Sequence, residues 1–114
     1  MAETKEYQVI VTNPAKFRFQ DEILEYIERN FSWNRAEEVE VEILNLVKSL
    51  SFNPQRGAIE KSLAIKNNTL RFVLYQATRY FEIKVLYLIE EDKRFVFIID
   101  FFPTRMNPSK IKSN

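Results

Sequence analysis

The first hydrophobic positions of the chain alternate with polar ones, as in a β-strand. Tyr7, Val9 and Val11 fall on one face of a stretch that is rich in β-branched residues, which predicts a strand. Asn13 and Pro14 follow directly. Because asparagine is a good N-cap and proline suits the first helical position, a helix is expected to begin there.

The next segment has the spacing of an amphipathic helix of about four turns. Its apolar residues recur at steps of seven, three and four positions: Phe17, Leu24, Ile27 and Phe31. Acidic residues line the other side of the same helix: Asp21, Glu22, Glu25 and Glu28. We therefore expect the apolar residues to face a core and the carboxylates to face water.

A second helix is predicted after a short break, with Ser32 or Asn34 as its N-cap. Its apolar residues also repeat at helical spacing: Ala36, Val39, Ile43, Leu46, Val47 and Leu50. The short break makes the two helices an αα-hairpin. The second helix is expected to stop at 52–57, because Pro54 disfavours helix at the residue before it and Gly57 can adopt a positive φ.

From residue 70 onward the hydrophobic period changes to two, which predicts three strands. The first covers 70–75. Alternate residues of the next share one face: Phe81, Ile83, Val85, Tyr87 and Ile89. After a turn at 91–93, the third strand ends before Pro103, and its apolar face is expected to hold four residues: Phe95, Phe97, Ile99 and Phe101.

These elements predict one α+β domain over residues 1–114, with an ordered core of about 7–103 and a tail at 104–114. Its order is β-α-α-β-β-β. Short connections favour antiparallel neighbours. The expected architecture is a two-helix hairpin packed on one face of a twisted, mainly antiparallel sheet.

Two helices can cover only one side of such a sheet. If the alternation is regular, the other face is half apolar, through Val73, Leu86, Leu88, Val96 and Ile98, and half charged, through Arg71, Lys84 and Asp100. A partly apolar uncovered face indicates a bound partner. A homodimer or the folded-back tail 104–114 is the alternative.

Composition removes several kinds of chemistry from the 114-residue chain. It has no cysteine and no histidine, which excludes disulfides, thiolate or histidine metal sites and Ser-His-Asp triads. Its single glycine leaves no Gly-rich phosphate loop, so we expect neither cofactor nor metal. No apolar run reaches the ~18 residues of a membrane span, and the start shows no secretory signal. A cytoplasmic protein is therefore expected.

The net charge of +1 conceals an uneven distribution along the chain. Residues 1–42 contain ten acidic and five basic residues, a net charge of −5. Residues 43–114 contain six acidic and twelve basic residues, a net charge of +6. A basic second half is typical of a protein that binds a polyanion or an acidic protein segment, although a basic sheet beside acidic helices would give the same distribution.

This order of elements resembles the RelE/ParE toxin superfamily of bacterial type II toxin–antitoxin (plasmid stabilisation) systems. The resemblance extends over about 7–108. It is carried by the opening strand with Pro14-Ala15, by the acidic second helix with Ala36, and by three later segments: Leu50-Ser51-Phe52-Asn53-Pro54-Gln55-Arg56-Gly57, Phe81-Glu82-Ile83-Lys84-Val85-Leu86-Tyr87 and Val96-Phe97-Ile98-Ile99-Asp100-Phe101-Phe102-Pro103.

The resemblance implies a small toxin that a cognate antitoxin protein holds silent. RelE-like members are mRNA interferases, which cut mRNA in the ribosomal A site without a metal. ParE-like members inhibit DNA gyrase and have no known catalytic residues. A non-toxic protein-binding module with the same fold is a third reading. We favour mRNA cleavage on the ribosome at this stage because the second half of the chain is basic.

For the cleavage branch, the resemblance implies catalytic roles for three cations. Arg71 resembles the family's strand-two arginine, Lys84 lies where many members have arginine before a tyrosine, and Arg105 resembles the basic residue after the last strand. The usual terminal histidine or tyrosine has no counterpart, because the chain lacks histidine and 106–114 lacks tyrosine. That departure counts against cleavage.

Metal-free cleavage of RNA needs a cation for the developing phosphorane charge and a proton acceptor for the 2′-hydroxyl. Asp100, Glu82 or a lysine with a lowered pKa could accept the proton, whereas a structural ion pair with Arg71 or Lys84 is the other reading of Asp100. Further candidates for nucleic-acid binding are Lys61, Lys66, Arg79 and Lys110. An antitoxin would lay an acidic, partly apolar segment over the hairpin or, with better charge complementarity, over the sheet.

Overall fold

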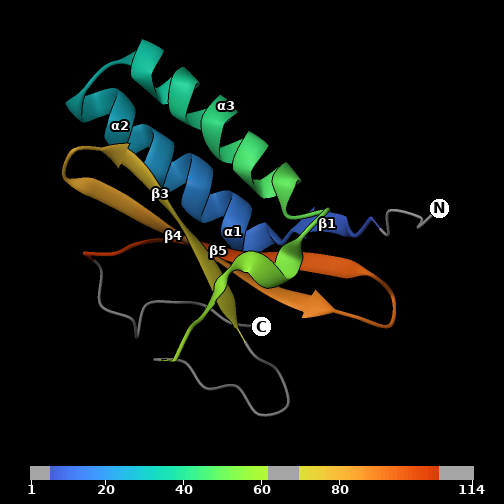
Figure 1. Cartoon of the computed structure of the whole chain (residues 1–114). Helices are drawn as coiled ribbons and strands as arrows, with labels where there is room; N and C mark the ends of the chain where they lie inside the picture. The colour runs from blue at the N-terminus through green and yellow to red at the C-terminus, as the bar shows by residue number, and fades with distance from the viewer. Residues whose placement is uncertain (1–5, 62–69, 106–114) are drawn as a thin grey trace.

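The protein forms a five-stranded mixed sheet with helices packed on one face (Figure 1). This computed structural model describes residues 6–61 and 70–105. The strands are β1 (Gln8–Val11), β2 (Ala58–Ile59), β3 (Arg71–Thr78), β4 (Phe81–Glu90) and β5 (Phe95–Pro103). The helical elements are α1 (Asn13–Phe17), the π-helix η1 (Arg18–Leu24), α2 (Glu25–Asn30), α3 (Trp33–Ser49) and the 3-10 turn η2 (Pro54–Arg56). The expected α+β architecture is confirmed.

The order of strands across the sheet is β1-β5-β4-β3-β2. β2, β3, β4 and β5 are joined by antiparallel pairs, as expected, whereas β1 pairs with β5 in parallel. This parallel pair ends where Val11 faces Ile98. The sequence did not predict β2, because a strand of two residues is too short to show alternation. The last strand runs through Pro103 and not to the residue before it.

The segments α1, η1 and α2 follow one another as a single helix with a π-helical middle (Figure 1). Its N-cap is Thr12 and not Asn13, because the Thr12 hydroxyl accepts a hydrogen bond from the Ala15 N–H at 3.4 Å. The same hydroxyl donates to the Ile98 carbonyl at 2.9 Å. One side chain therefore caps the helix and fixes its start against β5.

The buried face of this helix differs from the predicted face. The residues that reach the core are four apart: Ala15, Phe19, Ile23 and Ile27. Of the predicted residues, Ile27 is buried and Leu24 packs against the core, but Phe17 and Phe31 are 65% and 52% exposed. The π-helical segment explains the error, because its wider turn changes which side chains share a face and a 3.6-residue period no longer applies.

The second helix, α3, agrees closely with its prediction. Ser32 is the N-cap, and its hydroxyl accepts from the Arg35 N–H at 3.0 Å. All six predicted apolar residues lie in the core or against it: Ala36, Val39, Ile43, Leu46, Val47 and Leu50. Its spacing is regular throughout, so the period alone was sufficient. No helix in 6–61 or 70–105 has both the length and the apolar character to span a bilayer.

Several side chains lie on the opposite face of the sheet from the one that regular alternation predicts. On β5, Ile98 pairs with Tyr87 and Asp100 with Leu86, so Ile99 is an extra residue, a β-bulge. Before the bulge Val96 and Ile98 face the helices, and after it Phe101 does. Phe97 and Ile99 were expected toward the helices but join a cluster on the other side, here called the far face. Val73 also packs with the helix-side core and not on the far face.

Side-chain hydrogen bonds to Glu91 join Tyr7, near the start of the chain, to the turn between β4 and β5. The Tyr7 hydroxyl donates to Glu91 Oε1 at 2.6 Å, and the Gln55 amide donates to Glu91 Oε2 at 3.1 Å. The hydrogen bond from Tyr7 is the main cause that lowers the pKa of Glu91 below its ordinary value of 4.5. Because the shift favours the ionised carboxylate in the folded state, this contact stabilises the fold above that pH.

We predict that Tyr7→Phe lowers the free energy of unfolding at pH 7 by at most about 1 kcal/mol, since Glu91 is exposed. The stabilisation is fully present above about pH 4.5, the pKa of an unfolded glutamate, and is lost as the pH falls through the lower pKa of the folded state. Urea titrations at pH 7 and pH 3 test this, with the exposed Tyr80→Phe as the control. An equal loss at both pH values would contradict the role of Glu91.

Candidate functional site

The far face carries a compact apolar cluster. Its buried members are Leu70, Leu86, Ile99 and Phe102, with Phe72, Leu88 and Phe97 packed against them. All four buried side chains are at most 8% exposed. The expectation of an apolar far face is therefore right for Leu86 and Leu88, but the buried cluster is not an open docking surface.

Lys84 lies beside this cluster and is held in place by two groups. Its Nζ is 2.6 Å from Glu60 Oε1 and 4.5 Å from the centre of the Phe72 ring. The Glu60 side chain is only 5% exposed. The ion-pair partner considered for Lys84 was Asp100, so the pairing with Glu60 is a correction. Glu60 follows the short β2, and the strand that brings it to Lys84 gave no signal in the sequence.

Arg71 does not share the far face with Lys84. In the sheet it pairs with Tyr87, whose side chain is in the helix-side core. One terminal nitrogen of Arg71, Nη1, donates to the carbonyls of Gln55 at 3.1 Å and Gly57 at 2.7 Å. These two hydrogen bonds close the turn that follows α3, so the Arg71 guanidinium has a structural role.

The buried Tyr87 hydroxyl also binds this turn. It donates to the Pro54 carbonyl at 2.5 Å and accepts from the Gly57 N–H at 3.0 Å. Burial raises the pKa of Tyr87, and the nearby positive charges of Arg71 and Arg56 act against that rise.

Gly57 is required here for a reason that differs from the predicted one. Its φ is −72°, in the ordinary extended region, so the expected positive φ is wrong. A Cβ atom at this position would lie 2.1 Å from the Tyr87 hydroxyl oxygen and 2.8 Å from the Phe72 carbonyl oxygen. The glycine therefore allows the turn to approach β3 and β4 closely.

Arg105 and Arg79 both contact Tyr80 at the turn between β3 and β4. Arg105 Nη2 donates to the Tyr80 carbonyl at 2.7 Å, and the Arg79 guanidinium carbon is 5.5 Å from the centre of the Tyr80 ring. The Tyr80 side chain is 69% exposed. We call these three residues the tip cluster. The cations can contact a phosphate, and the exposed ring beside Arg79 can stack on a base.

The remaining predicted residues are scattered or outside the described part of the chain. Lys61 is exposed after β2, whereas Lys66 and Lys110 lie outside the described residues. The structure thus brings Arg79 and Arg105 together, but it does not assemble Arg71, Lys84 and Arg105 into one constellation. Each of these three cations contacts a different part of the fold.

Arg18 and Asp100 form a buried ion pair that sequence reasoning found only in part. Arg18 Nε donates to Asp100 Oδ1 at 3.0 Å and Nη2 to Oδ2 at 3.3 Å, while Nη1 donates to Glu22 Oε2 at 2.6 Å. Asp100 was expected to pair with Arg71 or Lys84, so its predicted partner is wrong. The only signal for Arg18 is a charged residue between Phe17 and Phe19.

Both members of this pair are removed from water, since Arg18 is 8% and Asp100 2% exposed. Burial acts to lower the pKa of Arg18, but the hydrogen bonds to Asp100 and Glu22 outweigh it and raise the pKa above its ordinary value. The guanidinium therefore stays charged. Asp100, engaged through both oxygens, has no role as the proton acceptor considered above.

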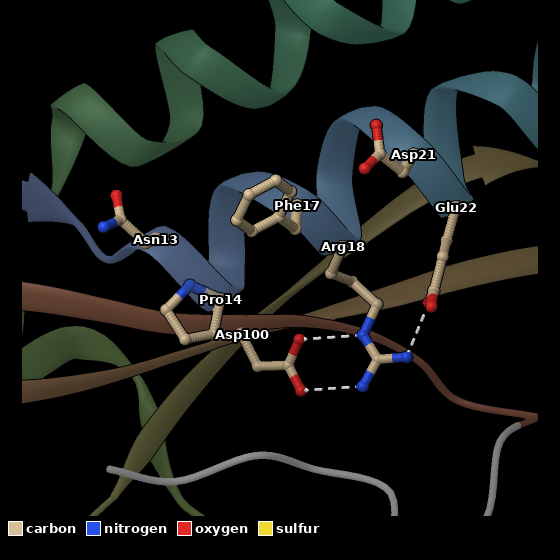
Figure 2. Close-up of a pocket in the computed structure, with 7 residues that line it drawn as sticks. All are labelled: Asn13, Pro14, Phe17, Arg18, Asp21, Glu22 and Asp100. Atoms are coloured by element: carbon tan, nitrogen blue, oxygen red, sulfur yellow. Dashed lines mark hydrogen bonds and ion pairs between the residues drawn. The ribbon is translucent and has the colours of Figure 1, made fainter.

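A cavity of about 380 Å³ opens beside the pair, between the first helix and β5. Figure 2 shows the Arg18 side chain extending from the helix to Asp100, with Glu22 at its other side. The lining also includes Asn13, Pro14, Phe17 and Asp21. Three carboxylates and one guanidinium give this cavity an excess of negative charge.

No protein-family model matches the chain, and no curated protein matches it either. Within residues 6–61 and 70–105, no three acidic side chains are grouped in a way that could hold a metal ion. Two arrangements suited to binding among the described residues are the tip cluster and the acidic cavity.

We predict that Arg71→Ala destabilises the fold by about 1.5–3 kcal/mol, because the carbonyls of the turn lose hydrogen bonds from a charged donor. The matched variant is Arg105→Ala, which removes an exposed arginine at the tip and is expected to change stability by less than about 0.5 kcal/mol. Chemical denaturation of both variants tests this. A fully stable Arg71→Ala protein would return Arg71 to the candidates for function.

We also predict a loss of about 3–5 kcal/mol for Asp100→Ala, because the Arg18 charge would stay buried without its main partner. The double variant with Arg18→Met removes both charges and is expected to recover most of the loss. Arg29→Ala, which breaks the exposed Arg29–Glu25 pair, is the control and should cost no more than about 0.5 kcal/mol. Equal stability of single and double variants would contradict a buried-charge penalty.

Proposed function

We propose that this protein is the toxin component of a bacterial type II toxin–antitoxin system of RelE/ParE type, and that it acts by binding its target without cutting RNA. The proposal that the protein does not cut RNA rests on the separation of the three expected catalytic cations. Arg71 closes the turn after α3, Lys84 pairs with Glu60, and Arg105 contacts the β3–β4 turn. Phosphodiester cleavage needs its cation and its proton acceptor around one phosphate.

The toxin assignment is supported by the order of elements together with their layers. A helical hairpin covers one face of a mixed sheet, and the chain from β3 to β5 forms an antiparallel meander (Figure 1). This is the arrangement that the resemblance to RelE/ParE toxins implied. The segments that carried the resemblance form α3 with the turn after it, β4 and β5.

In this proposal the target contact is made by the tip cluster of Arg79, Tyr80 and Arg105. These side chains are exposed and lie at one end of the sheet, where the β3–β4 hairpin projects. By analogy with ParE-like members the target is DNA gyrase. A ribosomal target with mRNA cleavage is the second candidate, and the observation that favours it is again the tip cluster, since arginine and tyrosine suit RNA.

The cognate antitoxin is the second proposed partner. An acidic segment fits the cations at the tip better than the acidic helices, where Asp21, Glu22, Glu25 and Glu28 are exposed. We expect the protein to copurify with the product of a short neighbouring gene. A soluble protein without affinity for that product would count against the antitoxin.

We predict that induced expression of the chain in a bacterial host stops growth and that the purified protein inhibits DNA supercoiling by gyrase. A reporter mRNA in a translating extract should stay intact by primer extension. The double variant Arg79→Ala, Arg105→Ala should lose at least tenfold in inhibition with an unchanged melting temperature. Lys93→Ala, which removes an exposed cation from the β4–β5 turn, should leave inhibition unchanged.

The alternatives give different results in the same assays. Cuts that occur only during translation and in phase with codons would support the ribosome-dependent nuclease and contradict a binding toxin. Harmless expression of the folded protein, with gyrase and translation unaffected, would contradict the toxin assignment and favour a non-toxic binding module.

A further inference from the structure

Two cavities meet at Glu22, along the side of the first helix that lies beside β5. The first is the acidic cavity of about 380 Å³ described above. The second, of about 260 Å³, is lined by Ile23, Tyr26, Phe81, Pro103 and Arg105 together with the shared Glu22. We call the two together the edge groove. The two cavities adjoin along the helix at Glu22, which lines both.

The acidic cavity suits a positively charged side chain. Its three carboxylates belong to Asp21, Glu22 and Asp100, and its one cation, Arg18, is bound to the last two. Among the described residues, Asp21 makes no hydrogen bond or ion pair. Phe17, 65% exposed, forms an aromatic wall. A lysine or arginine from another molecule could therefore pair with Asp21 and lay its stem on Phe17.

The second cavity suits an apolar side chain. The Tyr26 and Phe81 rings lie 4.8 Å apart between their centres and form one wall of it. Tyr26 is 38% exposed although it packs on a core residue. Pro103 and Ile23 complete an apolar surface, and burial of an aromatic or aliphatic side chain against it is favourable.

The edge of the sheet gives the groove its direction. β5 has β4 on one side and β1 on the other, but its pairing with β1 ends at Ile98. Along Ile99–Pro103 no described strand occupies the outer edge of β5. An extended segment is the shape that a sheet edge accepts. The helical residues of the two cavities are about six positions apart, roughly 9 Å, which two to three residues of extended chain span.

We propose that the edge groove binds an extended segment of a partner protein, with a lysine or arginine in the acidic cavity and an apolar or aromatic residue two to three positions away in the second cavity. Nucleic acid does not fit, because its phosphates would face three carboxylates. Arg105 of the tip cluster borders the second cavity, but the proposal rests on the carboxylates of the acidic cavity and on the Tyr26–Phe81 wall, so it does not depend on the toxin assignment.

A library of random nonapeptides displayed on phage, selected on the immobilised full chain, tests the proposal. The expected enriched peptides share one basic residue and one apolar or aromatic residue two to three positions apart. Asp21→Lys reverses the charge of an exposed residue in the acidic cavity and should reduce binding of such peptides at least tenfold. Asp92→Lys makes the same change in the β4–β5 turn, outside the groove, and should bind like the original chain.

The site is then located with one enriched peptide, synthesised and added to the ¹⁵N-labelled protein. Amide shifts are expected at Phe17, Asp21, Glu22, Ile23 and Tyr26. The proposal would be overturned by a selection without this pairing of residues, by Asp21→Lys binding as tightly as Asp92→Lys, or by shifts confined to other surfaces. Tyr26→Ala, checked for folding by circular dichroism, should weaken peptides in proportion to the size of their apolar residue.

Discussion

The buried ion pair between Arg18 and Asp100 is the interaction that sets how the helices sit on the sheet. It joins the first helix to β5 just beyond Ile98, where the parallel pairing with β1 ends. Either charge alone in that position would be strongly unfavourable, so rotation or sliding of the helix is penalised. The observed orientation of the helix about its own axis places Phe19 and Ile23 in the core and leaves Phe17 exposed to water.

Regular parts of the fold were predictable, and irregular parts were not. The face of α3 and the alternation along β4 follow constant periods, so the sequence was enough to assign their buried sides. The first helix and β5 each contain one irregularity, the π-helical segment from Arg18 to Leu24 and the bulge at Ile99. Each changes the phase of the side chains, and neither has a compositional signature. The single glycine was recognised as part of a turn, but its reason is the hydroxyl of Tyr87, which is distant in sequence.

Candidate site residues were harder to predict than the fold, because their roles depend on contacts between distant segments. The sequence indicated that Asp100 needs a partner, yet it could not select Arg18, 82 positions away. Arg71 and Lys84 are residue types that often bind phosphate. In this fold, however, Arg71 binds the loop after α3, and Lys84 pairs with Glu60, which follows the short β2. In this protein the cations that maintain the fold are largely different from those left exposed at the tip, so we expect substitutions at the tip to leave stability nearly unchanged.

The position of β5 in the sheet affects the order in which the chain can fold during synthesis. β1 is made first, but its partner strand is the last of the five to be made. Until residue 103 has left the ribosome, β1 has no partner strand, although β2, β3 and β4 can already pair and β4 offers the helical hairpin its inner side chains. The nascent chain therefore leaves the apolar side chains of β1, and the part of the helical surface that packs on β5, uncovered until the end of its translation.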